Sequence, residues 1–295
     1  MKTLTRPVAR AVVSVLLLLP AACGGVQEAP PAARVSLRFN KDRVPIRGPI
    51  ELTYRFEPLQ EIGGDYRVFV HVLTADGTIM WNDDHDPQPA TSAWRSGEPV
   101  EYTHTVFVPA FPYVGDATIR VGLYRGAERL PLETTAPDLV AAEERAYAVG
   151  TLRVLPEAES IFLIYGDGWH QEEYSPDDPS RSWQWTGKSA SVTFRNPRQD
   201  LTVLLQFDSR ADRFGDMPQQ VTITAGNQMV DTFPADSLDP VLRRIPLPAG
   251  LLGADDMAQL RISVDRPFLP SKDQPGSADI RELGIRVYHF YVEPR

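Results

Sequence analysis

Proline is the feature of this chain that most restricts its fold. The sequence holds 27 prolines among 295 residues, together with 20 glycines. That proline content is about 9%, against a usual value near 5%. Proline breaks a helix interior, and both residue types punctuate turns, so few windows remain for long helices. The sequence therefore predicts an all-β fold of short strands joined by turns, in a chain long enough for about two domains.

Alternation of apolar and polar residues supports this prediction over residues 34–155. Residues 35–40 and 52–56 alternate strictly, whereas 66–74 are apolar on both faces, which is typical of a central strand. Asp76-Gly77 then supplies a hairpin turn signal. About seven strands with regular turns predict an immunoglobulin-like sandwich. Its other strands are expected at 78–82, 101–108, 117–124 and 149–155, and residues 138–147 form either one short helix or a loop.

A second series of strands follows a polar joint at residues 156–160. Apolar residues alternate at 201–207, 221–223, 260–264 and 285–291, and the run at 161–165 is apolar throughout. Eight or nine strands over residues 161–295 predict a jelly-roll-like sandwich. The two halves share no strict internal repeat, so we expect two different β-sandwich domains in tandem.

The first 22 residues read as a signal peptide. Three positive charges precede the short apolar run at 11–19, which is too short to span a bilayer as a helix. The next residues, Pro20-Ala21-Ala22-Cys23, resemble a bacterial lipoprotein lipobox, although Pro20 stands where that motif usually has an aliphatic residue. The resemblance implies lipidation of Cys23 and a flexible tether over 23–33, with the protein at an outer membrane if the host is Gram-negative. The alternative is an ordinary secretory signal followed by a bystander cysteine.

Charge and cysteine count exclude several functions. The net charge of −9 and the pI near 5.1 argue against nucleic acid as a partner. Cys23 is the only cysteine, which excludes an internal disulfide, a CxxC redox pair and a thiolate zinc site. We expect no cofactor.

Longer motifs carry a second resemblance. The stretches 66–77, 85–100 and 117–132, and in the second half 166–173, 182–187 and 281–292, are similar to extracytoplasmic β-sandwich domains appended to bacterial membrane glycosyltransferases. This chain lacks their membrane-embedded catalytic portion. The resemblance therefore implies a freestanding accessory or binding module of the cell envelope and transfers no catalytic residue.

Catalytic motifs have little support. No G-x-S-x-G elbow is present, and the lone cysteine lies at the signal boundary. A polysaccharide hydrolase would need two facing carboxylates, and the acidic residues near Trp169 are the available candidates. They are Glu172, Glu173, Asp177 and Asp178. We expect most of them to face solvent, and we predict a protein that is not an enzyme.

A metal site has one weak sequence candidate. The run Asn82-Asp83-Asp84-His85-Asp86 follows a predicted strand, with His71 expected on the neighbouring strand, and its candidate ligands are Asp84, His85 and Asp86. Carboxylates and carbonyls suit calcium, and histidine with aspartate suits zinc, but neither a calcium-loop spacing nor H-E-x-x-H is present. We favour a solvated loop without a metal. His170 and Glu173 form a weaker pair.

Aromatic residues in the second half give the better candidate for binding. Sugar C–H faces stack on exposed indole rings while polar neighbours bind the hydroxyls. Trp183 and Trp185 share a face if they lie on a strand, and core packing is the favoured alternative for that pair. Trp169 follows Gly166-Asp167-Gly168 in a predicted loop, so we expect it to be more exposed. The candidate ligand-binding residues are Trp169, His170, Glu172, Trp183 and Trp185. Trp94 is expected to pin a loop onto the first sandwich.

These features predict a lipid-anchored, non-enzymatic envelope protein that binds or positions a surface glycan or a partner in glycan assembly. A protein-binding adaptor of an envelope complex is the alternative class, and a polysaccharide hydrolase is a third. The expected partners are the membrane, through an acyl anchor on Cys23, and a cell-surface polysaccharide or envelope proteins.

Overall fold

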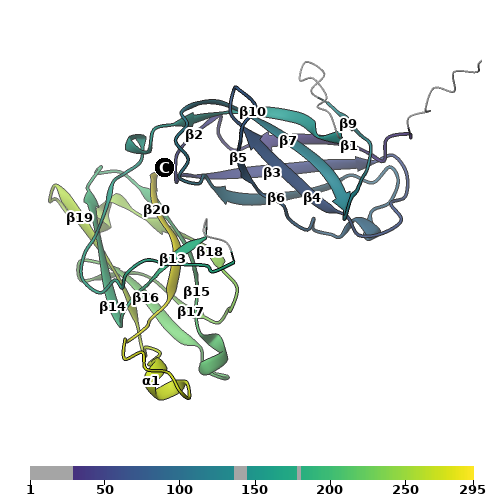
Figure 1. Ribbon diagram of the computed structural model, residues 1–295. Helices are drawn as coiled ribbons and strands as arrows, with labels where there is room; N and C mark the ends of the chain where they lie inside the picture. The colour runs from purple at the N-terminus through teal and green to yellow at the C-terminus, as the bar shows by residue number, and fades with distance from the viewer. Residues whose placement is uncertain (1–28, 136–144, 178–180) are drawn as a thin grey trace, which may run out of the picture. The chain divides into compact units, whose positions relative to one another are not determined.

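The computed structural model describes residues 29–135, 145–177 and 181–295 (Figure 1). Almost all of its regular structure is β, which confirms the all-β prediction. Among these residues, no helix is both long and apolar enough to span a membrane. The predicted signal peptide, Cys23 and most of the tether lie outside the described residues, as do Asp178 and most of the segment 138–147.

The first ten strands form two facing sheets. One sheet has the order β6-β3-β1-β9, and the other has the order β2-β10-β7-β4-β5 with β8 paired to β7. Their bounds are β1 (Ala33–Phe39), β2 (Arg43–Pro45), β3 (Pro49–Pro58), β4 (Arg67–Leu73), β5 (Ile79–Asn82), β6 (Val100–Phe107), β7 (Gly115–Arg125), β8 (Glu128–Arg129), β9 (Leu132–Thr134) and β10 (Tyr147–Leu155). Apart from the hairpins β4–β5 and β7–β8, successive strands alternate between the two sheets, and the two-sheet arrangement agrees with the predicted sandwich.

The inward residues of these strands form one hydrophobic core. Strand β4 lies between β7 and β5 and is buried on both faces, as its two-sided apolar pattern predicts. Gly77 turns the chain between β4 and β5 with a φ of 86°, which only glycine adopts readily. Trp94 is buried against Phe56, and its indole N–H donates to the Pro89 carbonyl at 2.9 Å. Trp94 therefore fixes its loop to the core as predicted.

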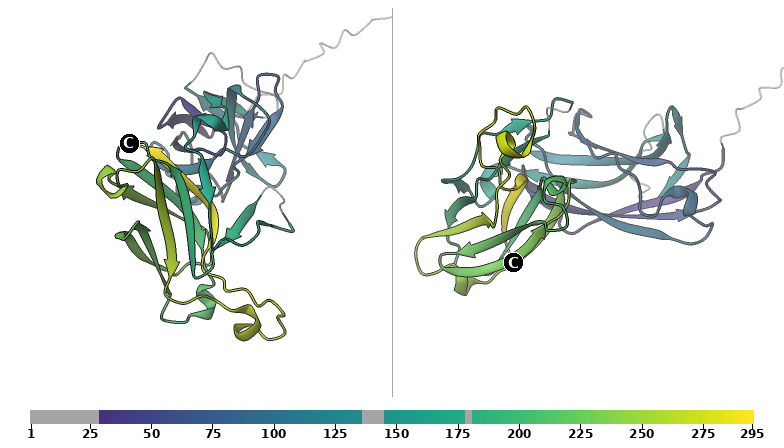
Figure 2. Two further views of the ribbon diagram at one scale, coloured as in Figure 1. Left: turned by 90° about the vertical axis from the view of Figure 1, so that its left-hand side faces the viewer. Right: turned by 90° about the horizontal axis from the view of Figure 1, so that it is seen from below.

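The last ten strands form two five-stranded sheets, in which every pairing is antiparallel. The orders are β11-β14-β19-β16-β17 and β12-β13-β20-β15-β18. In Figure 2, yellow marks β20, which lies between β13 and β15. The bounds are β11 (Leu163–Tyr165), β12 (Glu173–Tyr174), β13 (Ser182–Trp185), β14 (Ser189–Arg195), β15 (Leu201–Asp208), β16 (Gln219–Ala225), β17 (Gln228–Ala235), β18 (Val241–Leu247), β19 (Met257–Val264) and β20 (Arg286–Pro294).

A second hydrophobic core fills the space between these sheets. Two facing antiparallel sheets agree with the predicted double-sheet sandwich. The helical elements are single turns: η1 (Thr91–Ala93), η3 (Glu157–Glu159), η4 (Ala211–Arg213), η5 (Ala249–Leu251) and α1 (Pro270–Asp273). The division of the chain into two domains at residues 156–160 stays a prediction.

Candidate functional site

Two tryptophans and an arginine lie on one face of the sheet β12-β13-β20-β15-β18. Trp183 and Trp185 are two residues apart on β13, so their side chains project from the same face. Trp185 is opposite Arg286 of β20. The Arg286 guanidinium lies 5.0 Å from the Trp183 ring centre and 5.6 Å from that of Trp185. The predicted shared face is therefore present, with a cation packed on both rings.

A β-bulge in β20 adds Tyr288 to this face. Gln206 of β15 pairs with His289 and Phe207 pairs with Val287, which leaves Tyr288 as the extra residue. Such a bulge re-aims side chains along a strand. The Tyr288 ring centre lies 5.9 Å from that of Trp183, so the two rings are neighbours. We refer to Trp183, Tyr288, Arg286 and Arg181 as the aromatic face.

A buried carboxylate holds the aromatic face from below. The Asp208 side chain is 0% exposed and accepts hydrogen bonds from Arg286 Nε at 2.7 Å and from Tyr288 Oη at 2.8 Å. Burial, together with the bond to Asp208, raises the pKa of the Tyr288 hydroxyl to about 12. Tyr288 therefore stays protonated at neutral pH, and Arg286 is locked by a charge-assisted pair.

Arg181 contributes a cation at the open side of the aromatic face. Its guanidinium carbon lies 5.0 Å from the Tyr288 ring centre, and the residue is exposed. Within the described part of the chain, no carboxylate pairs with it, in contrast to Arg286. Arg181 is therefore available to donate hydrogen bonds to a ligand stacked on the neighbouring rings.

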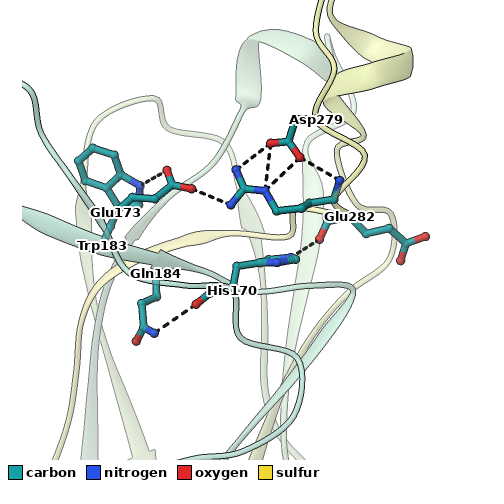
Figure 3. A network of polar contacts seen from close by, with 7 residues as sticks. His170, Glu173, Trp183, Gln184, Asp279 and Glu282 are labelled. Atoms are coloured by element: carbon teal, nitrogen blue, oxygen red, sulfur yellow. Dashed lines mark hydrogen bonds and ion pairs between the residues drawn. The ribbon is translucent and has the colours of Figure 1, made fainter.

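A polar network fixes the edge of the Trp183 ring (Figure 3). The Trp183 indole N–H donates to Glu173 at 3.1 Å, and the other oxygen of Glu173 accepts from Arg281 at 2.7 Å. Arg281 also donates to both oxygens of Asp279. Hydrogen bonds from Arg281 lower the pKa of Asp279 to about 2. Both carboxylates are thus held by one guanidinium.

His170 lies beside this network as a structural connector (Figure 3). Its Nε2–H donates to the carbonyl of Glu282 at 2.8 Å, because a carbonyl oxygen can only accept. Gln184 Nε2 donates to the His170 carbonyl at 3.2 Å. His170 ties β13 to the segment before β20, and it is half-buried.

Trp169 differs from the expectation of an exposed ring. It is half-buried against the second core, and its indole N–H donates to the Ser191 carbonyl at 2.8 Å. Tyr165 contacts the ring edge-on at 4.9 Å. Gly168 lets the chain fold back here, with a φ of 87°. An isolated β-bridge pairs Trp169 with Thr186, directly after β13, so Trp169 is a packing residue.

The remaining predicted binding residues divide between core and surface. Trp185 is buried in a small cluster with Phe268 and Leu283, as the core-packing alternative predicts. Glu172 is exposed and accepts a hydrogen bond from the Tyr174 hydroxyl at 2.8 Å. Of the five predicted binding residues, only Trp183 belongs to the aromatic face, where its ring is half-buried. The sequence pattern did not predict Arg286 and Tyr288 as its neighbours.

The predicted metal candidates separate in the structure. Asp84 accepts the Val70 N–H at 3.2 Å, and Asp86 pairs with Arg67 at 3.1 Å. His85 instead lies with Asp83 and His104, and one ligand atom from each lies within 4.8 Å of the others. Sequence reasoning missed His104 because it lies on a strand of the opposite sheet. The available signal was that His104 lies two residues after Tyr102 on a predicted strand, which places both side chains on one face of that strand.

Comparisons with known proteins give only distant likenesses. No family model matches, and no curated protein matches. Similar solved structures include a family GH115 4-O-methyl-α-glucuronidase (10% identity, TM-score 0.29, 50% of this chain and 19% of that one). They also include a β-glucuronidase of Bacteroides uniformis (11%, 0.30, 88% and 30%). A third covers the CBM51-2 and INT domains of Clostridium perfringens ZmpB (8%, 0.22, 60% and 38%). This chain spans less than half the length of each, and likenesses at this level do not establish a function.

Proposed function

We propose that this chain is a non-enzymatic lipoprotein of the cell envelope that binds a surface glycan on its aromatic face. The observation that carries the proposal is the pairing of Trp183 and Tyr288 with Arg181 on one sheet face. Aromatic rings offer a flat surface to sugar C–H groups, and a guanidinium donates directed hydrogen bonds to hydroxyls or carboxylates. Because Arg181 pairs with no carboxylate among the described residues, its charge favours glycans that contain uronic acids over neutral ones.

The fixed geometry of the rings supports binding. Arg286 is held by a buried carboxylate, and Trp183 is held through its indole N–H. A ring that is already ordered loses little conformational entropy when a ligand stacks on it. The aromatic face is therefore pre-organised.

The carboxylates near the rings support the non-enzymatic part of the proposal. A glycosidase needs one carboxylic acid with a raised pKa to protonate the leaving group. Arg281 instead binds both Glu173 and Asp279, and it lowers the pKa of Asp279 to about 2. A carboxylate that stays ionised cannot act as a general acid at neutral pH.

Attachment to the membrane through Cys23 is part of the same proposal. It is supported by the position of the only cysteine directly after an apolar run and two alanines. More than one acyl chain would hold the protein stably at a bilayer.

Calorimetry with a panel of neutral and uronic-acid polysaccharides tests the glycan proposal. We expect binding by the full-length chain in detergent, and Trp183→Ala should weaken it by about 1–3 kcal/mol. Phe162→Ala is the matched control, because Phe162 is an aromatic residue 79% exposed and outside the aromatic face. No heat with any polysaccharide, or equal affinity of wild type and Trp183→Ala, would refute the proposal.

A groove on the other sheet favours protein binding as the second candidate. Phe162, Ile164 and Met257 line this groove of about 550 Å³ and are 79%, 47% and 44% exposed. Exposed apolar side chains that cluster in this way are typical of protein contacts. The two candidates are separable, since Phe162→Asp would abolish capture of an envelope protein and leave glycan binding unchanged.

A further inference from the structure

Two histidines and an aspartate meet at one edge of the first sandwich. Asp83 and His85 follow β5 and continue its pairing with β4, through hydrogen bonds of Asp83 N to Val70 O and of His85 N to Val68 O. His104 lies on β6, which is the edge strand of the opposite sheet. The three side chains therefore connect the two sheets at their edges, next to β5 in one sheet and on β6 in the other.

The distances within this cluster fit one small cation. His104 Nδ1 lies 2.9 Å from Asp83 Oδ2, and His85 Nδ1 lies 3.8 Å from the same oxygen. Zinc bonds of about 2.0–2.1 Å in tetrahedral geometry separate neighbouring ligand atoms by about 3.3 Å. The observed distances lie on either side of that value, so shifts of about half an ångström would close the site.

Tyr102 can support the ligated form of His85. The Asp83 carbonyl, 2.8 Å from His85 Nδ1, can only accept, so Nδ1 carries the proton and Nε2 accepts from the Tyr102 hydroxyl at 2.9 Å. If Nδ1 binds a metal, the imidazole proton moves to Nε2. The Nε2–H group then donates a hydrogen bond to the Tyr102 hydroxyl oxygen. Metal-ligating histidines commonly donate their second N–H in this way.

A buried hydroxyl without a partner lies beside the cluster. Tyr54 is 0% exposed, and within the described residues its hydroxyl has no hydrogen bond. Its ring centre lies 5.1 Å from that of His85 and 5.3 Å from that of Tyr102. A buried hydroxyl without a hydrogen bond destabilises a fold, so packing alone does not account for the polar groups gathered here.

We propose that Asp83, His85 and His104 bind a divalent transition-metal ion of the zinc class. Imidazole nitrogens with one carboxylate suit zinc, whereas calcium takes six to eight oxygen ligands. Asp83 and His85 are 17% and 14% exposed, and His104 is 41% exposed, so an ion can enter from the side of His104. That open side leaves a coordination position for water or an external ligand.

Metal titration of the full-length chain in detergent tests this proposal, with Cys23→Ser as background so that no thiol can bind the ion. After removal of metal with a chelator, Co²⁺ absorption and Zn²⁺ competition should each give one site per chain. His104→Ala should weaken binding by more than about 100-fold, and Tyr102→Phe by about 10-fold. His71→Ala is the matched control, since His71 lies in the same sandwich outside the cluster, and it should bind as wild type does.

Several outcomes would overturn the proposal. The first is that the wild-type chain binds neither ion at about 100 µM. The second is that His104→Ala binds the metal as tightly as the wild type does, and the third is that His71→Ala loses as much affinity as His104→Ala. Displacement of Co²⁺ by Ca²⁺ at equal concentration would refute the zinc class. Circular dichroism identifies a variant that fails to fold, and in that case Asp83→Asn replaces it, because it keeps the shape of the side chain.

Discussion

Removal of the Asp208 carboxylate is the perturbation that most directly tests how the aromatic face is held. Asp208 is 0% exposed and pairs with Arg286, which is 25% exposed. The same carboxylate accepts the Tyr288 hydroxyl. Asp208→Ala would therefore leave a guanidinium without its anion and a hydroxyl without its acceptor.

The magnitude follows from burial. Breaking a buried ion pair by removing one partner costs about 3–5 kcal/mol, and a lost hydrogen bond adds about 1 kcal/mol. Arg286 is only partly buried, and it packs on the rings of Trp183 and Trp185, so water and the rings recover part of that cost. We expect Asp208→Ala to lower the free energy of unfolding by about 2–4 kcal/mol.

Urea unfolding followed by tryptophan fluorescence and circular dichroism measures this loss. The matched control is Asp256→Ala, because Asp256 and Arg198 of the same sandwich form a pair that is 92% and 63% exposed. An exposed pair contributes about 0–1 kcal/mol. If Asp208→Ala unfolds at the same urea concentration as Asp256→Ala, the pair does not hold the face and our reasoning about it is wrong.

Three further substitutions test the structure around the site, each by urea unfolding. Gly168→Ala should lower the free energy of unfolding by more than about 2 kcal/mol, because the new Cβ would lie 1.8 Å from the Ser189 carbonyl oxygen. In the control Gly226→Ala the new Cβ meets no atom within 4 Å, so the loss should be about 1 kcal/mol or less. Equal losses for the two variants would contradict the predicted clash. Trp169→Ala should cost about 2–4 kcal/mol because the ring packs on the core, and a smaller loss would restore Trp169 as an exposed platform. Asp279 has a folded pKa of about 2, below its ordinary 3.8, so its contribution to stability is present above pH 4 and is lost as the pH falls toward 2. Asp279→Asn should therefore lower the free energy of unfolding by about 1–2 kcal/mol at pH 7 and by less at pH 2. A stability difference between wild type and variant that does not change with pH would refute this linkage.

The strands that the sequence predicted either alternate apolar and polar residues or, as at 66–74 and 161–165, form short apolar runs. Missed strands include β17 and β18, which contain Pro234 and Pro246. Strands β17 and β18 are both edge strands. An edge strand tolerates proline, because the missing N–H can face the side that has no neighbouring strand. Proline content therefore predicted the class of fold and also concealed two of its strands.

The candidate site was only partly predictable for a different reason. The spacing of Trp183 and Trp185 implied a shared face, which depends on one strand alone. Their neighbours Arg286 and Tyr288 lie about 100 residues later, and their placement depends on the register of β13 with β20 and on a bulge. Register across such a separation is set by packing of the whole sheet, which no local pattern encodes.

Glu173 offers the last test of whether Trp183 is a binding platform or only a packing residue. Packing needs the ring but no particular rotation of it, whereas stacking on a sugar needs the ring plane fixed. Glu173 fixes that plane through the indole N–H and is itself 33% exposed beside Arg281.

We therefore expect Glu173→Ala to lower the free energy of unfolding by about 1 kcal/mol or less, as for other partly exposed pairs. Glycan affinity should fall by about tenfold, because the freed ring must be ordered again on binding. Glu172→Ala, one residue away and exposed, should change neither quantity. Loss of stability without loss of affinity would assign Trp183 to packing, and the glycan would then have to bind elsewhere on the chain.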